Sequence, residues 1–277
     1  MSKDKKTSDF YEDCRKRVHL MGVLNVTPDS FSDGGRFSKI EAAMEHAIKL
    51  KQDGADILDI GGESTRPGAD PVSLQEELDR TISLIEKISK TLDILISIDT
   101  YKSKVADEAM RAGAHIINDI SGLTFDDEML LTAARHNAIL VIMHIKGTPK
   151  NMQADPHYDD PVTEIMGFLS DSSNKAKTNG ISKIIVDPGL GFGKRFEDNF
   201  VILNNLDRLA SLGYPLMIGS SRKSYLGKPF DAPPLDRLEG TIVSNIIAMQ
   251  KGANILRVHD VKSVRRAVTI AEKIVNA

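Results

Sequence analysis

One pattern recurs along nearly the whole chain: a short apolar run, then a polar residue, then glycine or proline. In residues 183–194, KIIVDPGLGFGK, the β-branched run Ile184–Val186 ends at Asp187–Pro188 and a glycine-rich loop follows. Such a run predicts a strand buried on both faces, with Asp187 at its carboxyl end. A single buried carboxylate would need only a helix cap or an arginine as its partner. The recurrence of the pattern favours a shared site instead.

The pattern predicts eight strands, each followed by a helix that has apolar residues at helical spacing. The strands are expected at residues 18–26, 55–62, 94–99, 115–119, 138–144, 184–187, 215–220 and 254–260. Among the helices, one follows Ser73, which has Glu76 at capping-box spacing, and others are expected at 102–112 and 162–179. The alternation of strand and helix is typical of a parallel sheet covered by helices.

No linker or low-complexity run interrupts these units, so we predict a single-domain α/β fold, a (β/α)₈ TIM barrel over residues 18–277. The polar residues 1–17 are expected to form a poorly ordered tail. A doubly wound open sheet is the alternative, but it would gather its site at one switch point. Polar strand ends here occur in nearly every unit, which favours the barrel.

The glycine-rich loop after Asp187 is not a nucleotide-binding loop. A P-loop requires G-x-x-x-x-G-K-[ST], but Pro188 stands in place of the first glycine and Arg195 in place of the final Ser or Thr. The dinucleotide pattern G-x-G-x-x-G is also incomplete.

Composition narrows the class of function. A net charge of −3 gives no general attraction to nucleic acid or to an anionic membrane, and no stretch approaches the length of a membrane span. The one cysteine, Cys14, excludes an intrachain disulfide and a cysteine-rich metal site. We therefore expect a cytoplasmic protein that acts on small molecules.

In a barrel, the carboxyl ends of the strands form one face, where active sites lie. The polar or otherwise notable residues delivered to that face are Asn25, Glu63, Ser64, Thr65, Arg66, Asp99, Asn118, Met143, Asp187, Ser221, Lys223, Arg257 and His259. Asp and Asn suit the hydrogen-bonding edge of a flat heterocycle, whereas Arg, His, Lys, Ser and Thr suit phosphate. The set predicts a heterocycle pocket beside an anion pocket.

Several separated motifs resemble the signatures of the dihydropteroate synthase family. They are NVTPDSFSDGG (25–35), GGESTRPG (61–68), Asp99 after ILISI, INDISG (117–122), DPGLGFGK (187–194), SRKS (221–224) and RVHD (257–260). The resemblance implies that p-aminobenzoate attacks the methylene carbon of 6-hydroxymethyl-7,8-dihydropterin pyrophosphate, giving dihydropteroate and pyrophosphate. It also implies a dissociative mechanism, competition by sulfonamides and a homodimer built through late helices.

The resemblance further assigns roles to residues. The pterin-binding residues would be Asp99, Asn118, Met143, Asp187, Lys223 and Arg257. The pyrophosphate-binding residues would be Asn25, Ser64, Thr65, Arg257 and His259, with Mg²⁺ bound through Asn25. The p-aminobenzoate site would use Phe31, Arg66, Pro67, Phe192, Ser221 and Ser224 and would form only after loops 27–38 and 62–72 order over pyrophosphate. The catalytic residues would be Asn25, Asp33, Lys223, Arg257 and His259.

Two other functions remain open at this point. Corrinoid-dependent methyltetrahydrofolate methyltransferases resemble the chain at Asp99, Asn118 and Asp187, but they do not require an anion site. A non-catalytic pterin-binding module would typically lose Asn25, Lys223 or Arg257, which are all present. His144 is interpreted as structural, and loop 145–162 matches no motif.

Overall fold

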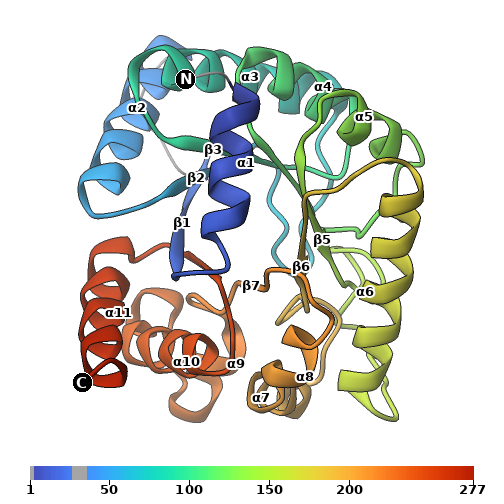
Figure 1. Cartoon of the computed structure of the whole chain (residues 1–277), viewed down its shortest axis with the longest axis vertical. Helices are drawn as coiled ribbons and strands as arrows, with labels where there is room; N and C mark the ends of the chain where they lie inside the picture. The colour runs from blue at the N-terminus through green and yellow to red at the C-terminus, as the bar shows by residue number, and fades with distance from the viewer. Residues whose placement is uncertain (1–2, 27–35) are drawn as a thin grey trace.

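The computed structural model describes residues 3–26 and 36–277. Across these residues eight parallel strands, with helices between them, form a (β/α)₈ barrel (Figure 1). The strands are β1 (His19–Asn25), β2 (Ile57–Gly61), β3 (Leu95–Asp99), β4 (Ile116–Asp119), β5 (Ile139–Met143), β6 (Ile184–Asp187), β7 (Met217–Ile218) and β8 (Ile255–Val258). Each lies within or at the limits of a run predicted from the sequence.

The strand order shows that the sheet curls into a barrel. It runs β6-β5-β4-β3-β2-β1-β8-β7, so that β6 and β7 are the two ends. These ends meet through a parallel bridge between Val186 and Leu216, and the Val186 amide donates to the Pro215 carbonyl at 3.0 Å. The predicted barrel is confirmed, and the doubly wound alternative is wrong because an open sheet has no such contact.

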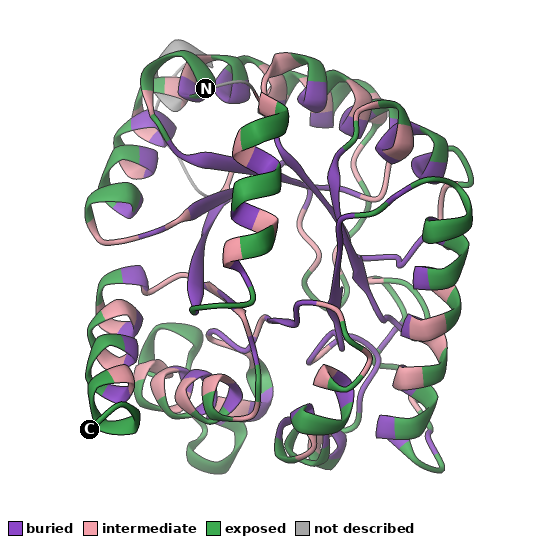
Figure 2. Cartoon of the chain, viewed as in Figure 1, coloured by how far each residue is buried: buried purple, intermediate pink, exposed green. Residues whose placement is uncertain are grey.

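The helices cover the outside of the sheet. They are α2 (Arg36–Gln52), α3 (Leu74–Thr91), α4 (Ser103–Ala112), α5 (Met129–Arg135), α6 (Pro161–Thr178), α7 (Phe196–Asn204), α8 (Leu206–Ala210), α10 (Leu238–Gln250) and α11 (Val261–Val275). The predicted cap of α3 is present, since the Ser73 hydroxyl accepts from the Glu76 amide at 3.2 Å. One predicted helix is split at Asn205 into α7 and α8. Figure 2 shows buried strands and helices whose outer faces are exposed.

The inward-facing residues change in character along the barrel axis. Near the amino ends of the strands they form an apolar layer: Met21, Ile57, Leu95, Ile116, Ile139, Val141, Ile185, Met217 and Ile255. Because side chains alternate along a strand, the next inward positions lie two residues further on. At those positions stand Asp59, Ser97, Asn118, Met143, Asp187 and Arg257. The apolar layer closes the bottom of the barrel, and the polar layer forms the floor of a site at its top.

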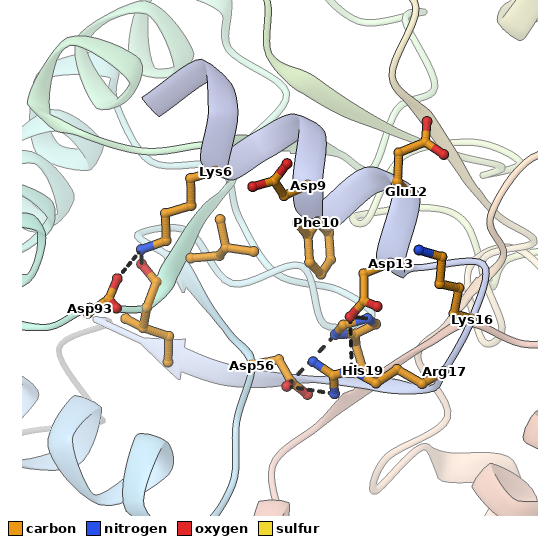
Figure 3. A pocket seen from close by; sticks show the side chains of 12 residues that line it. Lys6, Asp9, Phe10, Glu12, Asp13, Lys16, Arg17, His19, Asp56 and Asp93 are labelled. Carbon is orange, nitrogen blue, oxygen red and sulfur yellow. Dashed lines mark hydrogen bonds and ion pairs between the residues drawn. The ribbon is translucent and has the colours of Figure 1, made fainter. Parts of the chain in front are cut away.

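Residues 3–17 do not form the loosely attached tail that the sequence suggested. Residues Lys3–Asp13 form helix α1, which lies across the amino ends of the strands (Figure 1). Phe10 and Cys14 belong to the apolar layer, and Phe10 meets the His19 ring edge-on at 4.8 Å. The Tyr11 hydroxyl donates to the Ile184 carbonyl at 2.9 Å, and Lys6 pairs with Asp93 at 2.7 Å (Figure 3). The charged composition of the segment concealed these apolar contacts.

Burial has a chemical consequence for the cysteine in this region. Cys14 is fully buried and free, and desolvation raises the pKa of its thiol to about 12. Reactivity of a cysteine requires the thiolate, so this thiol acts as a packing group.

None of the described helices is long and apolar enough to cross a membrane.

Candidate active site

A cavity lies at the carboxyl ends of the strands, on the face predicted for the site. Its lining residues are Thr65, Asp99, Asn118, Ile120, Met143, Asp187, Gly189, Leu190, Phe192, Met217, Gly219, Lys223 and Arg257. All six predicted pterin-binding residues are among them, together with Thr65 and Phe192 from the other predicted sets. Residues from seven different strand–helix units therefore meet at one place.

Arg257 connects two carboxylates across the floor of this cavity. Its Nε donates to Asp59 Oδ2 and its Nη2 to Asp99 Oδ2, both at 2.6 Å. Asn118 Nδ2 also donates to Asp59 Oδ2, at 3.2 Å. Burial raises the pKa of Asp99 and Arg257 opposes that rise, while the two carboxylates raise the pKa of Arg257. The guanidinium thus pairs with both carboxylates in a buried place.

Three oxygens in this network have no hydrogen-bond partner among the described residues. They are Asp59 Oδ1, Asp99 Oδ1 and Asn118 Oδ1, and all are buried. A buried acceptor without a donor costs free energy, and native structures rarely leave one unexplained. The network is therefore suited to a ligand that brings N–H donors.

Asp187 and Lys223 form the second charged part of the cavity. Asp187 Oδ1 accepts from the Gly189 amide at 2.7 Å, and burial raises the pKa of this carboxyl to about 6. Burial and Arg257 lower the pKa of Lys223 to about 8. The Lys223 ammonium lies 4.1 Å from the centre of the Phe192 ring, a cation–π contact. A carboxylate acceptor and an ammonium donor thus line the same cavity.

The glycines of the loop after β6 permit close backbone packing. A Cβ on Gly189 would lie 2.0 Å from the His144 carbonyl oxygen, and one on Gly193 would lie 2.2 Å from that of Lys146. The buried Lys194 ammonium fastens the same contact, donating to the carbonyls of His144 (3.1 Å) and Phe192 (3.0 Å). His144 Nδ1 lies 2.8 Å from this ammonium, and burial lowers the His144 pKa. These contacts fit the structural interpretation of His144.

His259 is held by Ser221 just above Arg257. The Ser221 hydroxyl oxygen accepts from the His259 backbone amide at 3.1 Å and lies 3.1 Å from Nδ1 of the ring. Burial, followed by Arg257, lowers the His259 pKa to about 3, so the imidazole is neutral near pH 7. The Ser221 hydroxyl faces Nδ1, and Nε2 is the other ring nitrogen. A neutral His259 ring does not add a positive charge to the site.

The remaining predicted residues lie around the cavity. Asn25 ends β1 beside Gly61, where a Cβ would meet Asn25 Oδ1 at 3.2 Å and Asp99 Oδ2 at 3.6 Å. Ser224 lines a neighbouring cavity. Ser64, Arg66 and Pro67 belong to the loop after β2 and do not line the main cavity, and Phe31 and Asp33 lie outside the described residues.

Asp59 is the residue of the site that the sequence analysis missed. It is fully buried and bonds to both Arg257 and Asn118. The signal was present, because a carboxylate stands in the middle of the apolar strand ILDIG. Asp59 stands at the centre of its strand, whereas the recurring polar pattern marks strand ends.

The described residues contain no cluster of three His, Cys, Asp or Glu side chains that could hold a metal ion. Oxygens of Asn25 and Asp99 both lie close to Gly61, and they are the hard donors that Mg²⁺ prefers. Mg²⁺ commonly uses few protein ligands when substrate phosphates supply the rest. The donor set therefore fits an ion that arrives with a phosphorylated substrate.

The barrel and its cavity define an enzyme that recognises a flat, polar heterocycle from the carboxyl ends of its strands. Residues 21–259 match the family model described as "Pterin binding enzyme". The chain belongs to this family and, within it, to the dihydropteroate synthases.

The similar proteins support this assignment over nearly the full length. The dihydropteroate synthase of Synechocystis is 47% identical over 94% of this chain and 91% of its own. That of Bacillus subtilis is 44% identical over 95% of this chain and 90% of its own.

Solved structures agree. A Yersinia pestis dihydropteroate synthase in complex with a sulfonamide drug has a TM-score of 0.90 and 44% identity, covering 95% of this chain and 96% of that one. A Xanthomonas albilineans dihydropteroate synthase with 4-aminobenzoic acid has a TM-score of 0.89 and 41% identity, covering 96% and 98% respectively.

Proposed function

We propose that this dihydropteroate synthase condenses 6-hydroxymethyl-7,8-dihydropterin pyrophosphate with p-aminobenzoate by a dissociative route, in which pyrophosphate leaves before the aniline nitrogen attacks. The observation that carries the proposal is the set of unpartnered buried oxygens on Asp59, Asp99 and Asn118 beside Asp187 and Lys223. A dihydropterin presents amino and ring N–H donors along one edge and a carbonyl oxygen on the other, which complements this arrangement.

Asp187 accepts from the 2-amino group and a ring N–H of the pterin. Its carboxylate already accepts from the Gly189 amide, which fixes its orientation. Asn118 and Asp99 accept from the rest of the donor edge, and Met143 packs against the ring. Lys223 leaves the Phe192 ring and donates to the pterin carbonyl oxygen and a ring nitrogen. Binding then satisfies Asp99 Oδ1 and Asn118 Oδ1, which have no hydrogen-bond partner among the residues that the structure describes.

The leaving pyrophosphate lies toward Asn25, Ser64, Thr65, Arg257 and His259. The Arg257 guanidinium supplies positive charge, and the neutral His259 ring donates a hydrogen bond from Nε2. Asn25 would hold Mg²⁺ beside the leaving group, where the ion would neutralise part of the developing negative charge. Stabilisation of charge that develops in the transition state is commonly the largest catalytic term.

Departure of pyrophosphate leaves a dihydropterin methylene cation. The carboxylates of Asp99 and Asp187 line the cavity and favour a cation within it electrostatically. The aniline nitrogen of p-aminobenzoate is uncharged near pH 7 and forms the C–N bond with its lone pair, then loses a proton. Asp33 is proposed to steady the cation or take up that proton.

The p-aminobenzoate site is proposed at Phe31, Arg66, Pro67, Phe192, Ser221 and Ser224. Phe192 lines the main cavity, and Gly191 and Ser224 line the cavity next to it, so an aromatic acid can extend from one to the other. The complexes of the two similar enzymes with a sulfonamide and with 4-aminobenzoic acid support binding of both ligand types here. We expect p-aminobenzoate to bind tightly only after pyrophosphate has ordered the loops, which calorimetry with and without pyrophosphate tests.

A homodimer in the cytoplasm is also proposed. Exposed apolar side chains lie on the two late helices, with Val243 and Ile247 on α10 and Ile270 and Ile274 on α11. Exposed apolar patches commonly mark contact surfaces. Sedimentation equilibrium of Val243→Asp against wild type tests the dimer, and an unchanged mass would contradict it. The reduced Cys14 is compatible with the cytoplasm.

The activity is tested by pyrophosphate release with and without p-aminobenzoate. Release that depends on p-aminobenzoate and yields dihydropteroate is the expected result. The dissociative route is tested separately with substrate labelled with ¹⁸O at the bridging oxygen and a benzoate that lacks the amine. We expect the label in recovered substrate to move from the bridging oxygen to non-bridging oxygens. If the label does not move, the dissociative step is contradicted, while the proposed activity is unaffected.

A further inference from the structure

The loop between β5 and α6 makes contacts that no sequence motif predicted. We call residues 145–158 the strap. It lies between the end of β5 and the start of α6. A turn at its centre is fixed by the Asn151 side chain, whose Oδ1 accepts from the Thr148 amide at 2.8 Å. The Met152 amide donates to the Thr148 carbonyl at 2.7 Å. The strap is therefore an ordered element.

The Met152 side chain packs the strap against the active site. Its side chain is 3% exposed and belongs to one apolar cluster with Ile120, Met143 and Phe192. Those three residues also line the main cavity. Met152 consequently packs among the residues that form the apolar side of the substrate site.

Two further contacts join the strap to neighbouring loops. The Gly68 amide donates to the Pro149 carbonyl at 2.9 Å. Gln153 Nε2 donates to the Gly191 carbonyl at 2.7 Å. Gly68 follows Pro67 in the chain and Gly191 precedes Phe192, so each bond holds a loop one residue away from a proposed p-aminobenzoate contact.

The returning end of the strap is anchored independently. The Tyr158 hydroxyl donates to the Gly193 carbonyl at 2.5 Å, and the Tyr158 side chain is 3% exposed. The Lys146 ammonium lies 4.1 Å from the centre of its ring. With this end fixed, loss of the Gln153 bond frees the Gly191 side without releasing the whole strap.

We propose that the strap is a specificity-determining element that fixes the separation of Pro67 and Phe192, with Met152 and Gln153 as its positioning residues for p-aminobenzoate. The inference rests on the proposed p-aminobenzoate site. The pterin acceptors Asp99, Asn118 and Asp187 stand on β3, β4 and β6, which the barrel holds without the strap. The strap therefore acts on the second substrate and on sulfonamides, and it leaves pterin affinity unchanged.

The test compares substitutions in the strap under steady-state turnover, varying p-aminobenzoate at saturating pterin substrate. Gln153→Ala removes the hydrogen bond to the Gly191 carbonyl oxygen. Gln153→Glu places a carboxylate oxygen against that carbonyl oxygen, so that two acceptors face each other. Loss of one hydrogen bond corresponds to roughly a 3- to 10-fold rise in the KM for p-aminobenzoate. We expect the sulfonamide Ki to rise with it and kcat to stay within about twofold. Asp155→Asn, an exposed change in the same strap, is the matched control.

A second pair of variants keeps the test independent of Gln153. Met152→Ala opens a gap beside Phe192 and should also raise the KM for p-aminobenzoate, whereas Met152→Leu nearly conserves volume and should restore it. Pterin affinity, measured by calorimetry, should not change in these variants.

The outcomes separate the two levels of inference. One outcome is that Gln153→Ala, Gln153→Glu and Met152→Ala turn over like the wild type, with an unchanged KM for p-aminobenzoate. That outcome would overturn the role of the strap and leave the proposed function intact. A parallel loss of pterin affinity in these variants would overturn it as well, since the effect would then be general. If the wild-type protein binds pterin but does not consume p-aminobenzoate, the proposed function itself is contradicted.

Discussion

Arg257 and Asp59 form a buried ion pair that joins β8 to β2, the two strands that flank β1, with Nε 2.6 Å from Oδ2. Asp59 has no exposed surface. The same guanidinium reaches Asp99 at 2.6 Å, so one cation orients two carboxylates. A site that must receive a heterocycle with several N–H donors thereby keeps its acceptors in place before the ligand arrives.

Asp59→Ala should destabilise the fold, because it leaves the buried Arg257 with a single partner. Removing one member of a buried ion pair costs about 3 kcal/mol or more of unfolding free energy. Asp59→Asn keeps an acceptor oxygen and should cost less. Urea unfolding measures the difference, with the exposed Asp127→Ala as control. A free energy of unfolding for Asp59→Ala equal to that of wild type would show that the ion pair does not contribute to stability.

The missed role of Asp59 shows where sequence reasoning stops. The eight strands could be predicted because buried parallel strands are apolar runs with sharp ends, and the strand-end residues Asp99, Asn118 and Asp187 followed from that. The partner of Arg257 depends on which strands lie close together in the sheet, where β2 and β8 flank β1, a relation that a linear pattern does not contain. The same applies to α1, whose few apolar residues find their contacts only in three dimensions.

Asp187→Ala should weaken binding of the pterin substrate. The substitution leaves pterin donors without an acceptor and removes a carboxylate that balances Lys223. The expected loss of binding free energy is on the order of 2–4 kcal/mol. Calorimetric titration with the bare pterin measures it, and Asp171→Asn on the outer surface of α6 is the control. Unchanged affinity would remove Asp187 from the site.

Pterin affinity should also fall at low pH, because Asp187 must be ionised to accept from the ligand. Burial raises its pKa to about 6 from the ordinary value of 3.8. Below pH 6 the association constant should therefore decrease, approaching about tenfold per pH unit. In Asp187→Asn the part of this decrease that is due to Asp187 should be absent, while Asp99, whose pKa burial raises to about 7, still titrates. An affinity that stays constant from pH 7 to 5 in wild type would contradict the assignment.

The raised pKa of Asp187 also makes the stability of the ligand-free chain depend on pH, in the opposite direction from pterin affinity. Since the folded carboxyl keeps its proton to a higher pH than the unfolded one, its favourable contribution in the ligand-free chain is complete below pH 3.8. That contribution is lost as the pH rises through about 6. Relative to wild type, Asp187→Asn should thus become progressively more stable between these values, as urea unfolding at several pH values would reveal.

Phe10→Ala tests whether α1 is part of the fold. Phe10 packs on His19 and the apolar layer, at the end of the barrel opposite the site, so its loss should affect stability without affecting turnover. Truncating a buried Phe costs about 3 kcal/mol of unfolding free energy. We expect that loss in urea unfolding, together with a kcat unchanged at a temperature where the variant remains folded. The exposed Glu12→Ala on the same helix is the control. If Phe10→Ala unfolds at the wild-type urea concentration, the helix is a loosely attached tail after all.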